Sequence, residues 1–229
     1  MDPNQKPLTP FEEGQVLLID KPYEWTSFQV VNKLKWKLRH TYKLAKLKIG
    51  HAGTLDPLAT GLLIVCTGKF TKRIEEFQAQ EKEYTGTFVL GATTPCYDME
   101  KPVDREFSTE HITTDMIMQT AQSFIGEQDQ VPPIFSAVKI DGKRAYDYAR
   151  QSQDVEIKAK SITIKAFEVT RIEMPEVDFR IVCSKGTYIR AIARDFGDRL
   201  KSGAYLSALR RTRIGEFLVA DADNTLLAE

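Results

Sequence analysis

The order of strand-like and helix-like segments constrains the fold of this chain more than any other feature of its sequence. Alternating or continuous hydrophobic residues predict strands at 15–20, 84–90, 161–171 and 177–183. The last two are separated only by a short proline-containing segment, so we expect them to pair. Helical segments stand among these strands without a regular strand–helix–strand repeat, which favours the α+β class. We therefore expect a largely antiparallel mixed sheet flanked by helices.

Three segments have the spacing of amphipathic helices. The first begins at Thr26 or Ser27, the second at Thr113, and the third covers 188–201. In the third segment the apolar residues recur on one face, and three arginines fall outside that face: Arg190, Arg194 and Arg199.

Two further segments are harder to assign. The apolar run 62–66 is too short for its periodicity to distinguish a strand from a helix. An irregular stretch that begins at 131–133 leads to a turn at 141–142 and a short helical pattern at 146–150. We find no internal repeat or linker, so one domain is the simplest organisation.

Charge is balanced overall but unevenly distributed along the chain. The 229 residues include 32 Lys and Arg and 32 Asp and Glu, and this neutral total argues mildly against a nucleic-acid binder. However, 32–49, the first basic stretch, holds seven Lys and Arg and no acid. The second basic stretch, 185–213, holds eight against two acids. Such segregation permits one positive face on a neutral protein, although two solvated helix faces explain the pattern equally well.

Composition and cysteine usage exclude several classes of protein. The longest unbroken apolar run is 62–66, whereas a membrane-spanning helix needs about 20 such residues. The first ten residues lack the apolar region of a secretory signal. Cys66, Cys96 and Cys183 are far apart and form neither a disulfide framework nor a zinc-binding spacing. We expect a cytoplasmic protein without a membrane segment or a structural metal.

The segment 50–61, Gly-His-Ala-Gly-Thr-Leu-Asp-Pro-Leu-Ala-Thr-Gly, has the densest turn signals in the chain. Pro57 favours an extended conformation at Asp56, and a carboxylate on a tightly turned loop can serve as a nucleophile or base. The alternative is an Asx-turn in which Asp56 only caps the following segment. The spacing matches neither a P-loop nor a dinucleotide-binding glycine motif.

Five segments together resemble the TruB family of tRNA pseudouridine synthases. The segment that contains Asp56 resembles the catalytic motif of that family, and the resemblance runs from about residue 14 to residue 217. The other four occur in the order of the family: 18–22, 82–91, 131–139, and 183–190 followed by 209–211.

The resemblance implies roles for eight residues. The catalytic positions are Asp56, Arg190, which would pair with the aspartate, and Tyr84, which would stack on the target base. The substrate-binding positions are His51, Tyr188, Leu209, Lys21 and Lys72.

The resemblance also implies an activity: isomerisation of the uridine at position 55 in the T-loop of tRNA, without cofactor or metal. In that reaction the N1–C1′ bond of uridine breaks, the uracil turns, and C5 bonds to C1′. The target uridine would be flipped out of its stack. We expect a monomer that acts on the T-arm, with a flexible segment at 1–13 and a catalytic domain at 14–229. Many family members continue into a C-terminal PUA domain, which we do not expect here.

Three other interpretations remain open. One is a synthase of related fold that acts on another RNA, and a second is an RNA-binding folding chaperone for which Asp56 would be dispensable. A third is a glycoside hydrolase, which needs two catalytic acids about 5–10 Å apart, whereas only Asp56 stands in a motif. The sequence also leaves open whether Asp56 attacks C6, attacks C1′ or removes a ribose proton.

Overall fold

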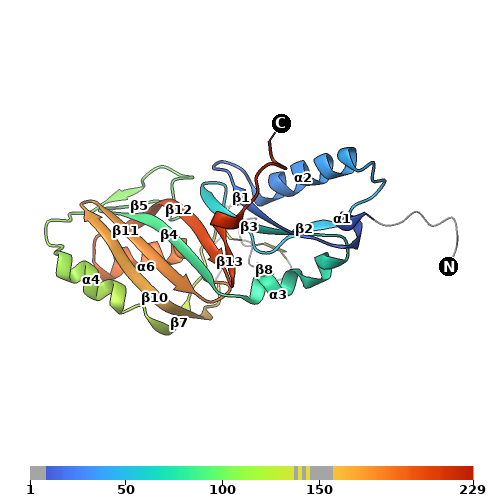
Figure 1. Cartoon of the computed structure of the whole chain (residues 1–229). Coiled ribbons are helices and arrows are strands. Elements are labelled where there is room, and N and C mark those ends of the chain that lie inside the picture. The colour runs from blue at the N-terminus through green and yellow to red at the C-terminus, as the bar shows by residue number, and fades with distance from the viewer. Residues whose placement is uncertain (1–8, 137–138, 141–142, 145–156, 229) are drawn as a thin grey trace, which may run out of the picture. The chain divides into compact units, whose positions relative to one another are not determined.

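A computed structural model describes residues 9–136, 139–140, 143–144 and 157–228, and the chain forms two compact units (Figure 1). Unit 1 comprises Met1–Lys82 and Arg210–Glu229, and unit 2 comprises Glu83–Leu209. The strand β12 (Ala204–Ile214) passes from unit 2 into unit 1. Whether the two units act as the single catalytic domain expected from the sequence stays a prediction.

Unit 1 is built around β3 (Ala59–Thr67), which pairs antiparallel with β1 (Val16–Lys21) and with the short β2 (Ile49–His51). The strand order is β1, β3 and then the C-terminal part of β12. The remaining elements of this unit are α1 (Pro10–Glu13), α2 (Ser27–Thr41), η1 (Gly68–Arg73), α3 (Ile74–Ala79), β13 (Phe217–Leu218) and η2 (Val219–Asp221).

The apolar run that could not be assigned from the sequence is the middle of β3, and both of its faces are covered. Leu63 and Val65 pack with apolar residues of α2, whereas Leu62, Ile64 and Cys66 join a second cluster with α3 and the end of β12. A strand buried on both faces reads as a continuous hydrophobic run rather than an alternating one. This explains why its periodicity could not distinguish a strand from a helix.

Local signals account for the helices of unit 1. Thr26 caps α2 in a capping box with Gln29, so the helix begins where the sequence predicts. The segment expected to be loose up to residue 13 contains α1 at its end, where Thr9 and Glu12 form a second capping box. No helix in the described part of the chain combines the length and apolar character that crossing a membrane requires.

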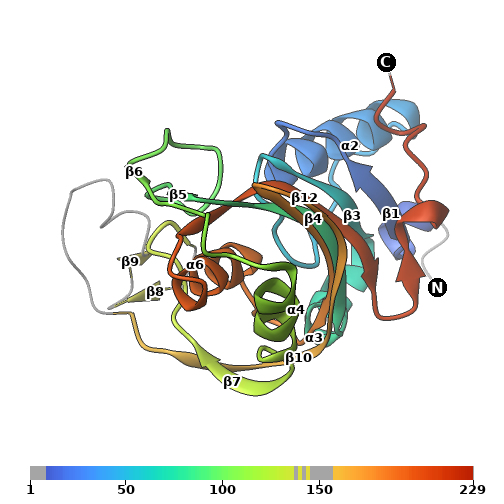
Figure 2. The same ribbon diagram turned by 90° about the vertical axis from the view of Figure 1, so that its left-hand side faces the viewer.

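In unit 2, β12 is followed in strand order by β4 (Lys82–Leu90), β11 (Glu176–Cys183), β10 (Lys160–Glu173) and β7 (Gly126–Gln130). The expected pairing of 161–171 with 177–183 is confirmed, because β10 and β11 form an antiparallel hairpin. This sheet curves around α4 (Thr114–Gln122) and α6 (Ile189–Arg199) (Figure 2). Two small sheets complete the unit: β5 (Ala92–Thr93) with β6 (Arg105–Glu106), and β8 (Lys139–Ile140) with β9 (Lys143–Arg144).

Phenylalanine rings fill the space between the sheet and the helices of unit 2. Phe88 of β4 packs against Phe179 of β11 with ring centroids 4.2 Å apart, and Phe196 of α6 lies 5.4 Å from Phe88. Phe124 and Phe167 extend this cluster. Such aromatic contacts add to the free energy of apolar burial, and they fix α6 against the sheet.

The α+β class predicted from the sequence is confirmed. The predicted strands at 15–20 and 84–90 correspond to β1 and β4, and the predicted helices to α2, α4 and α6. The turn predicted at 141–142 and the helix predicted at 146–150 lie outside the described residues.

Candidate active site

Asp56 lies on the loop that joins β2 to β3, and hydrogen bonds anchor this loop on both sides of the carboxylate. Before Asp56, the Ala52 amide donates to the Ile64 carbonyl (2.8 Å). The buried Ser27 hydroxyl accepts from the Leu55 amide (2.9 Å) and donates to the Leu55 carbonyl (3.2 Å). After it, the Ala59 amide donates to the Asp56 carbonyl (3.1 Å). The loop therefore holds a half-buried carboxylate in a defined place, as the nucleophile interpretation requires.

Lys21, at the end of β1, is fully buried beside this loop. Its ammonium group donates to the carbonyls of Pro22 (2.8 Å), Trp25 (2.5 Å) and Pro57 (3.2 Å), the last directly after Asp56. Burial lowers the pKa of Lys21 to about 8, while the charge of Asp56 opposes this shift and that of Arg211 adds to it. Unit 1 thus supplies a buried cation that interacts with Asp56. The ammonium group, which we expected to bind substrate, is turned toward backbone carbonyls.

His51 ends β2 and is half-buried at the start of the same loop. Burial lowers the pKa of His51, and the positive charge of Arg211 lowers it further, while the backbone of Gly53 opposes the shift. The lowered pKa favours a neutral imidazole at physiological pH, which can both donate and accept hydrogen bonds. Lys72, the other basic position expected near the site, is exposed in η1.

Arg211 lies beside the same loop, and no role is expected for it from the sequence. Its side chain is fully buried, with Nε donating to the Leu62 carbonyl (2.8 Å) and Nη2 donating to the Gly53 carbonyl (3.1 Å). A signal for its burial was present in the sequence. Successive side chains of a strand point to opposite faces, so the adjacent pair Arg210 and Arg211 in β12 must place one arginine inward.

The other expected site residues belong to unit 2. Tyr84 lies in β4 with its side chain largely buried, and Leu209 is half-buried in β12. Tyr188 is the N-cap of α6, and its backbone is held by Gln130, whose side chain accepts from the Tyr188 amide (2.8 Å) and donates to its carbonyl (3.1 Å). These contacts fix the first turn of the helix that carries Arg190.

Arg190 lies outside the apolar face of the helix, as the sequence predicts, yet its side chain is buried. Its guanidinium donates to the carbonyls of Cys96 (3.2 Å) and Phe135 (2.9 Å), and its Nε lies 3.5 Å from Oδ2 of the buried Asp98. These groups compensate the buried charge, and all three come from segments far from α6 in the sequence. The pairing of Arg190 with Asp56 stays a prediction.

Among the residues that the structure describes, no group of three or more His, Cys, Asp or Glu is disposed to hold a metal ion.

Comparison with known proteins identifies the family. Residues 39–189 match the family model described as TruB family pseudouridylate synthase (N terminal domain). The protein named tRNA pseudouridine synthase B of Flavobacterium johnsoniae is 60% identical over 226 residues, which cover 97% of this chain and 99% of that protein. The protein of the same name from Chloroherpeton thalassium is 50% identical over 214 residues, covering 92% of this chain and 87% of that protein.

Solved structures agree with this assignment. A chain in the crystal structure of a Cbf5-Nop10-Gar1 complex superimposes with a TM-score of 0.67 at 31% identity, covering 91% of this chain and 50% of that chain. A chain in the structure of an H/ACA RNP bound to a substrate RNA containing 2′-deoxyuridine gives 0.63 at 28% identity, with 91% and 49% covered. The chain thus spans about half the length of these solved chains. The resemblance seen in the five sequence segments is confirmed: the chain belongs to the TruB family of pseudouridylate synthases and is an isomerase.

Proposed function

We propose that this protein isomerises uridine to pseudouridine at position 55 in the T-loop of tRNA, with Asp56 as the catalytic nucleophile or base. Relatives named tRNA pseudouridine synthase B, which align along almost the whole chain, support tRNA as the substrate. The observation that carries the proposal is the loop of Asp56, which is tied down on both sides and lies within electrostatic reach of the buried Lys21.

The proposed reaction uses Asp56 as a carboxylate. The charges of Asp56 and Lys21 interact, because Asp56 raises the pKa of Lys21 against the effect of burial. In the proposed reaction the N1–C1′ bond breaks, the freed uracil turns, and C5 bonds to C1′. The proton on C5 is then lost to a base and N1 gains a proton, so no oxidant or reductant takes part.

Access to the reacting bond requires that the target uridine leave its stack in the folded loop of the RNA. Tyr84 is proposed to stack on the extruded base, a contact worth about 1–3 kcal/mol for aromatic residues that bind unstacked bases. The first basic stretch is proposed to bind phosphates, and its exposed lysines include Lys35 and Lys46. Lys37 is already engaged, because its ammonium group donates to the carbonyls of Thr225 (3.1 Å) and Ala228 (2.6 Å).

The test is the Asp56→Asn variant, assayed on a T-arm stem-loop whose target uridine carries tritium at C5. Because the new bond forms at C5, wild-type protein should release the label, whereas Asp56→Asn should bind the RNA with normal affinity and release none. Asp104→Asn is the matched control, since that exposed carboxylate accepts a hydrogen bond from Thr93 in unit 2. Turnover by Asp56→Asn would refute the mechanism. Absence of label release by wild-type protein would refute the substrate and favour an RNA-binding chaperone.

A further inference from the structure

Arg211 joins the loop of Asp56 to the central strand of unit 1. Its two acceptors lie on either side of Asp56 in the sequence: the Gly53 carbonyl precedes it in the loop, and the Leu62 carbonyl follows it in β3. A single rigid guanidinium fork therefore fixes the separation between the first half of the loop and the strand into which the loop leads.

The backbone of Arg211 is itself fixed by close packing. A Cβ atom placed on Gly61 would lie 2.3 Å from the Arg211 carbonyl oxygen and 2.7 Å from its amide nitrogen, so β12 contacts β3 directly at this point. A Cβ atom on Gly53, where φ is +98°, would lie 3.7 Å from Nη1 of Arg211. The guanidinium therefore lies against the turn that precedes Asp56, and a glycine at 61 leaves the room that the backbone of Arg211 occupies.

The charge of Arg211 is difficult to explain by stability alone. Apolar residues of similar volume often replace buried charged groups without loss of stability, and one core cluster of unit 1 is built from apolar side chains such as Leu62, Ile64 and Ile214. An arginine keeps its proton in proteins, so this position holds a permanent positive charge under the loop. That charge acts on two groups of the site, since it lowers the pKa values of both His51 and Lys21.

We propose that Arg211 is a positioning residue for the reaction: it holds the turn at Gly53, and through that turn Asp56, in the geometry that the reaction requires. This inference rests on the proposed function of Asp56. The fork supplies the position, and the permanent charge adds to the effect of burial in lowering the pKa of His51.

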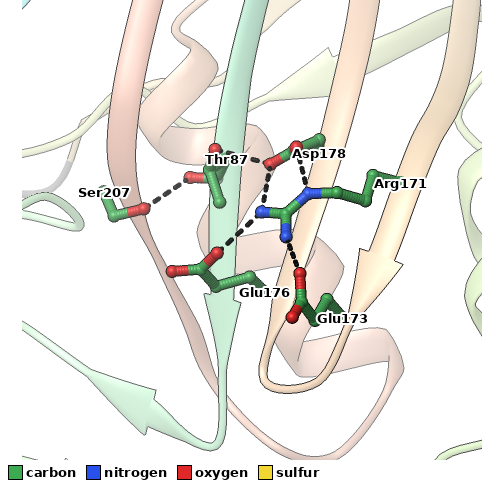
Figure 3. Close-up of polar contacts among 6 residues, drawn as sticks. All are labelled: Thr87, Arg171, Glu173, Glu176, Asp178 and Ser207. Atoms are coloured by element: carbon green, nitrogen blue, oxygen red, sulfur yellow. Dashed lines mark hydrogen bonds and ion pairs between the residues drawn. The ribbon is translucent and has the colours of Figure 1, made fainter.

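Arg171 offers a matched control, because it too is an arginine with several partners. Its guanidinium contacts Glu173, Glu176 (2.7 Å) and Asp178 (2.6 Å) on the β10–β11 hairpin, and Thr87 and Ser207 continue the network (Figure 3). The neighbouring carboxylates would repel phosphate, so removal of Arg171 should affect stability and leave catalysis unchanged.

The experiment compares Arg211→Met, Arg211→Lys and Arg171→Met under conditions in which each is shown to be folded. In single-turnover assays with saturating T-arm RNA, Arg211→Met should lower the rate of pseudouridine formation by about 100-fold, a typical effect of misplacing a reacting group by about 1 Å. Its RNA affinity should stay within about twofold of wild type, since its side chain is buried. Arg211→Lys retains the charge without the fork and should restore only part of the rate.

A second measurement does not depend on activity. The imidazole pKa of His51, followed by NMR, should rise in Arg211→Met, stay near wild type in Arg211→Lys, and be unchanged in Arg171→Met. A wild-type rate in folded Arg211→Met, or a loss confined to RNA affinity, would overturn the inference. Absence of pseudouridine formation by the wild-type protein would instead refute the proposed function, and the His51 titration would still show whether Arg211 acts on the loop.

Discussion

The buried ammonium group of Lys21 should make the stability of the folded protein depend on pH in an unusual direction. Burial lowers the pKa of Lys21 from its ordinary value of 10.5 to about 8. The charge of Asp56 opposes this shift, and that of Arg211 reinforces it. The perturbation that isolates this effect is Lys21→Met, which removes the titrating group and retains an unbranched side chain.

The sign follows from the proton balance between the folded and unfolded states. Because the pKa is lower in the folded state, the unfolded chain holds more protons between pH 8 and pH 10.5, so the free energy of unfolding rises with pH through that window. The penalty for charging buried Lys21 is fully present below pH 8 and has disappeared above pH 10.5. Its size is about 3 kcal/mol, from the shift between the two pKa values and 1.36 kcal/mol per pH unit.

The assay is urea unfolding of wild-type protein and Lys21→Met at intervals from pH 7 to pH 10.5, in reducing buffer. The variant lacks three hydrogen bonds of the wild type, so its stability differs by a constant amount, and only the difference in pH dependence is diagnostic. We expect wild type to gain about 3 kcal/mol relative to Lys21→Met across the window. Lys21→Arg keeps its charge across this pH range, so the pH dependence of its unfolding free energy should match that of Lys21→Met. Parallel curves for wild type and Lys21→Met would show that Lys21 is not desolvated as described.

Three other perturbations have defined outcomes. Gly61→Ala combines a positive φ with a backbone clash and should cost about 3–6 kcal/mol of unfolding free energy. Gly126→Ala has a similar φ with open space around it and should cost about 1–2 kcal/mol. Equal losses of the two variants in urea unfolding would contradict the close approach of β12 to Gly61. Charge reversal at Lys35 and Lys46 should weaken RNA binding and reduce the salt slope by about one unit for each phosphate that is no longer neutralised, and an unchanged slope would mean that the first basic stretch is only solvated. Arg190→Ala removes the cation from a buried ion pair and should lower the free energy of unfolding by about 3–5 kcal/mol. Arg190→Lys should recover part of the stability and part of the rate of pseudouridine formation. A wild-type rate in Arg190→Ala would exclude a role of Arg190 in the reaction.

Elements with local signals were predictable from the sequence. The start of α2 follows from the capping box at Thr26, and the hairpin of β10 and β11 follows from two hydrophobic runs separated by a short turn segment. The middle of β3 was not predictable, because helix α2 and the α3 cluster cover its two faces and remove the alternation on which a strand assignment depends.

In the candidate site, too, the features that depend on neighbouring residues were predictable, and those that depend on distant residues were not. The loop of Asp56 is visible as a dense run of turn residues and a family motif. The cations around this loop could not be recognised from the sequence, because their hydrogen-bond partners are distant in the chain. Lys21 is 36 residues from its acceptor at Pro57, and Arg211 is 158 residues from its acceptor at Gly53. Burial of a cation depends on such distant acceptors, so the helical pattern places Arg190 outside the apolar face but cannot show the segments that bury it.

The distinction between buried and exposed cations changes the meaning of the second basic stretch. The charge pattern permits both basic stretches to form one positive face, yet Arg190 and Arg211 in the second are buried, and Arg210 and Arg213 form ion pairs with acidic side chains of unit 1. A cation already neutralised within the protein releases few counterions when RNA binds. The first basic stretch, in contrast, contains no acid and keeps most of its lysines exposed. The salt dependence of RNA binding should therefore originate mainly from the first stretch, although the two stretches carry nearly equal numbers of positive charges.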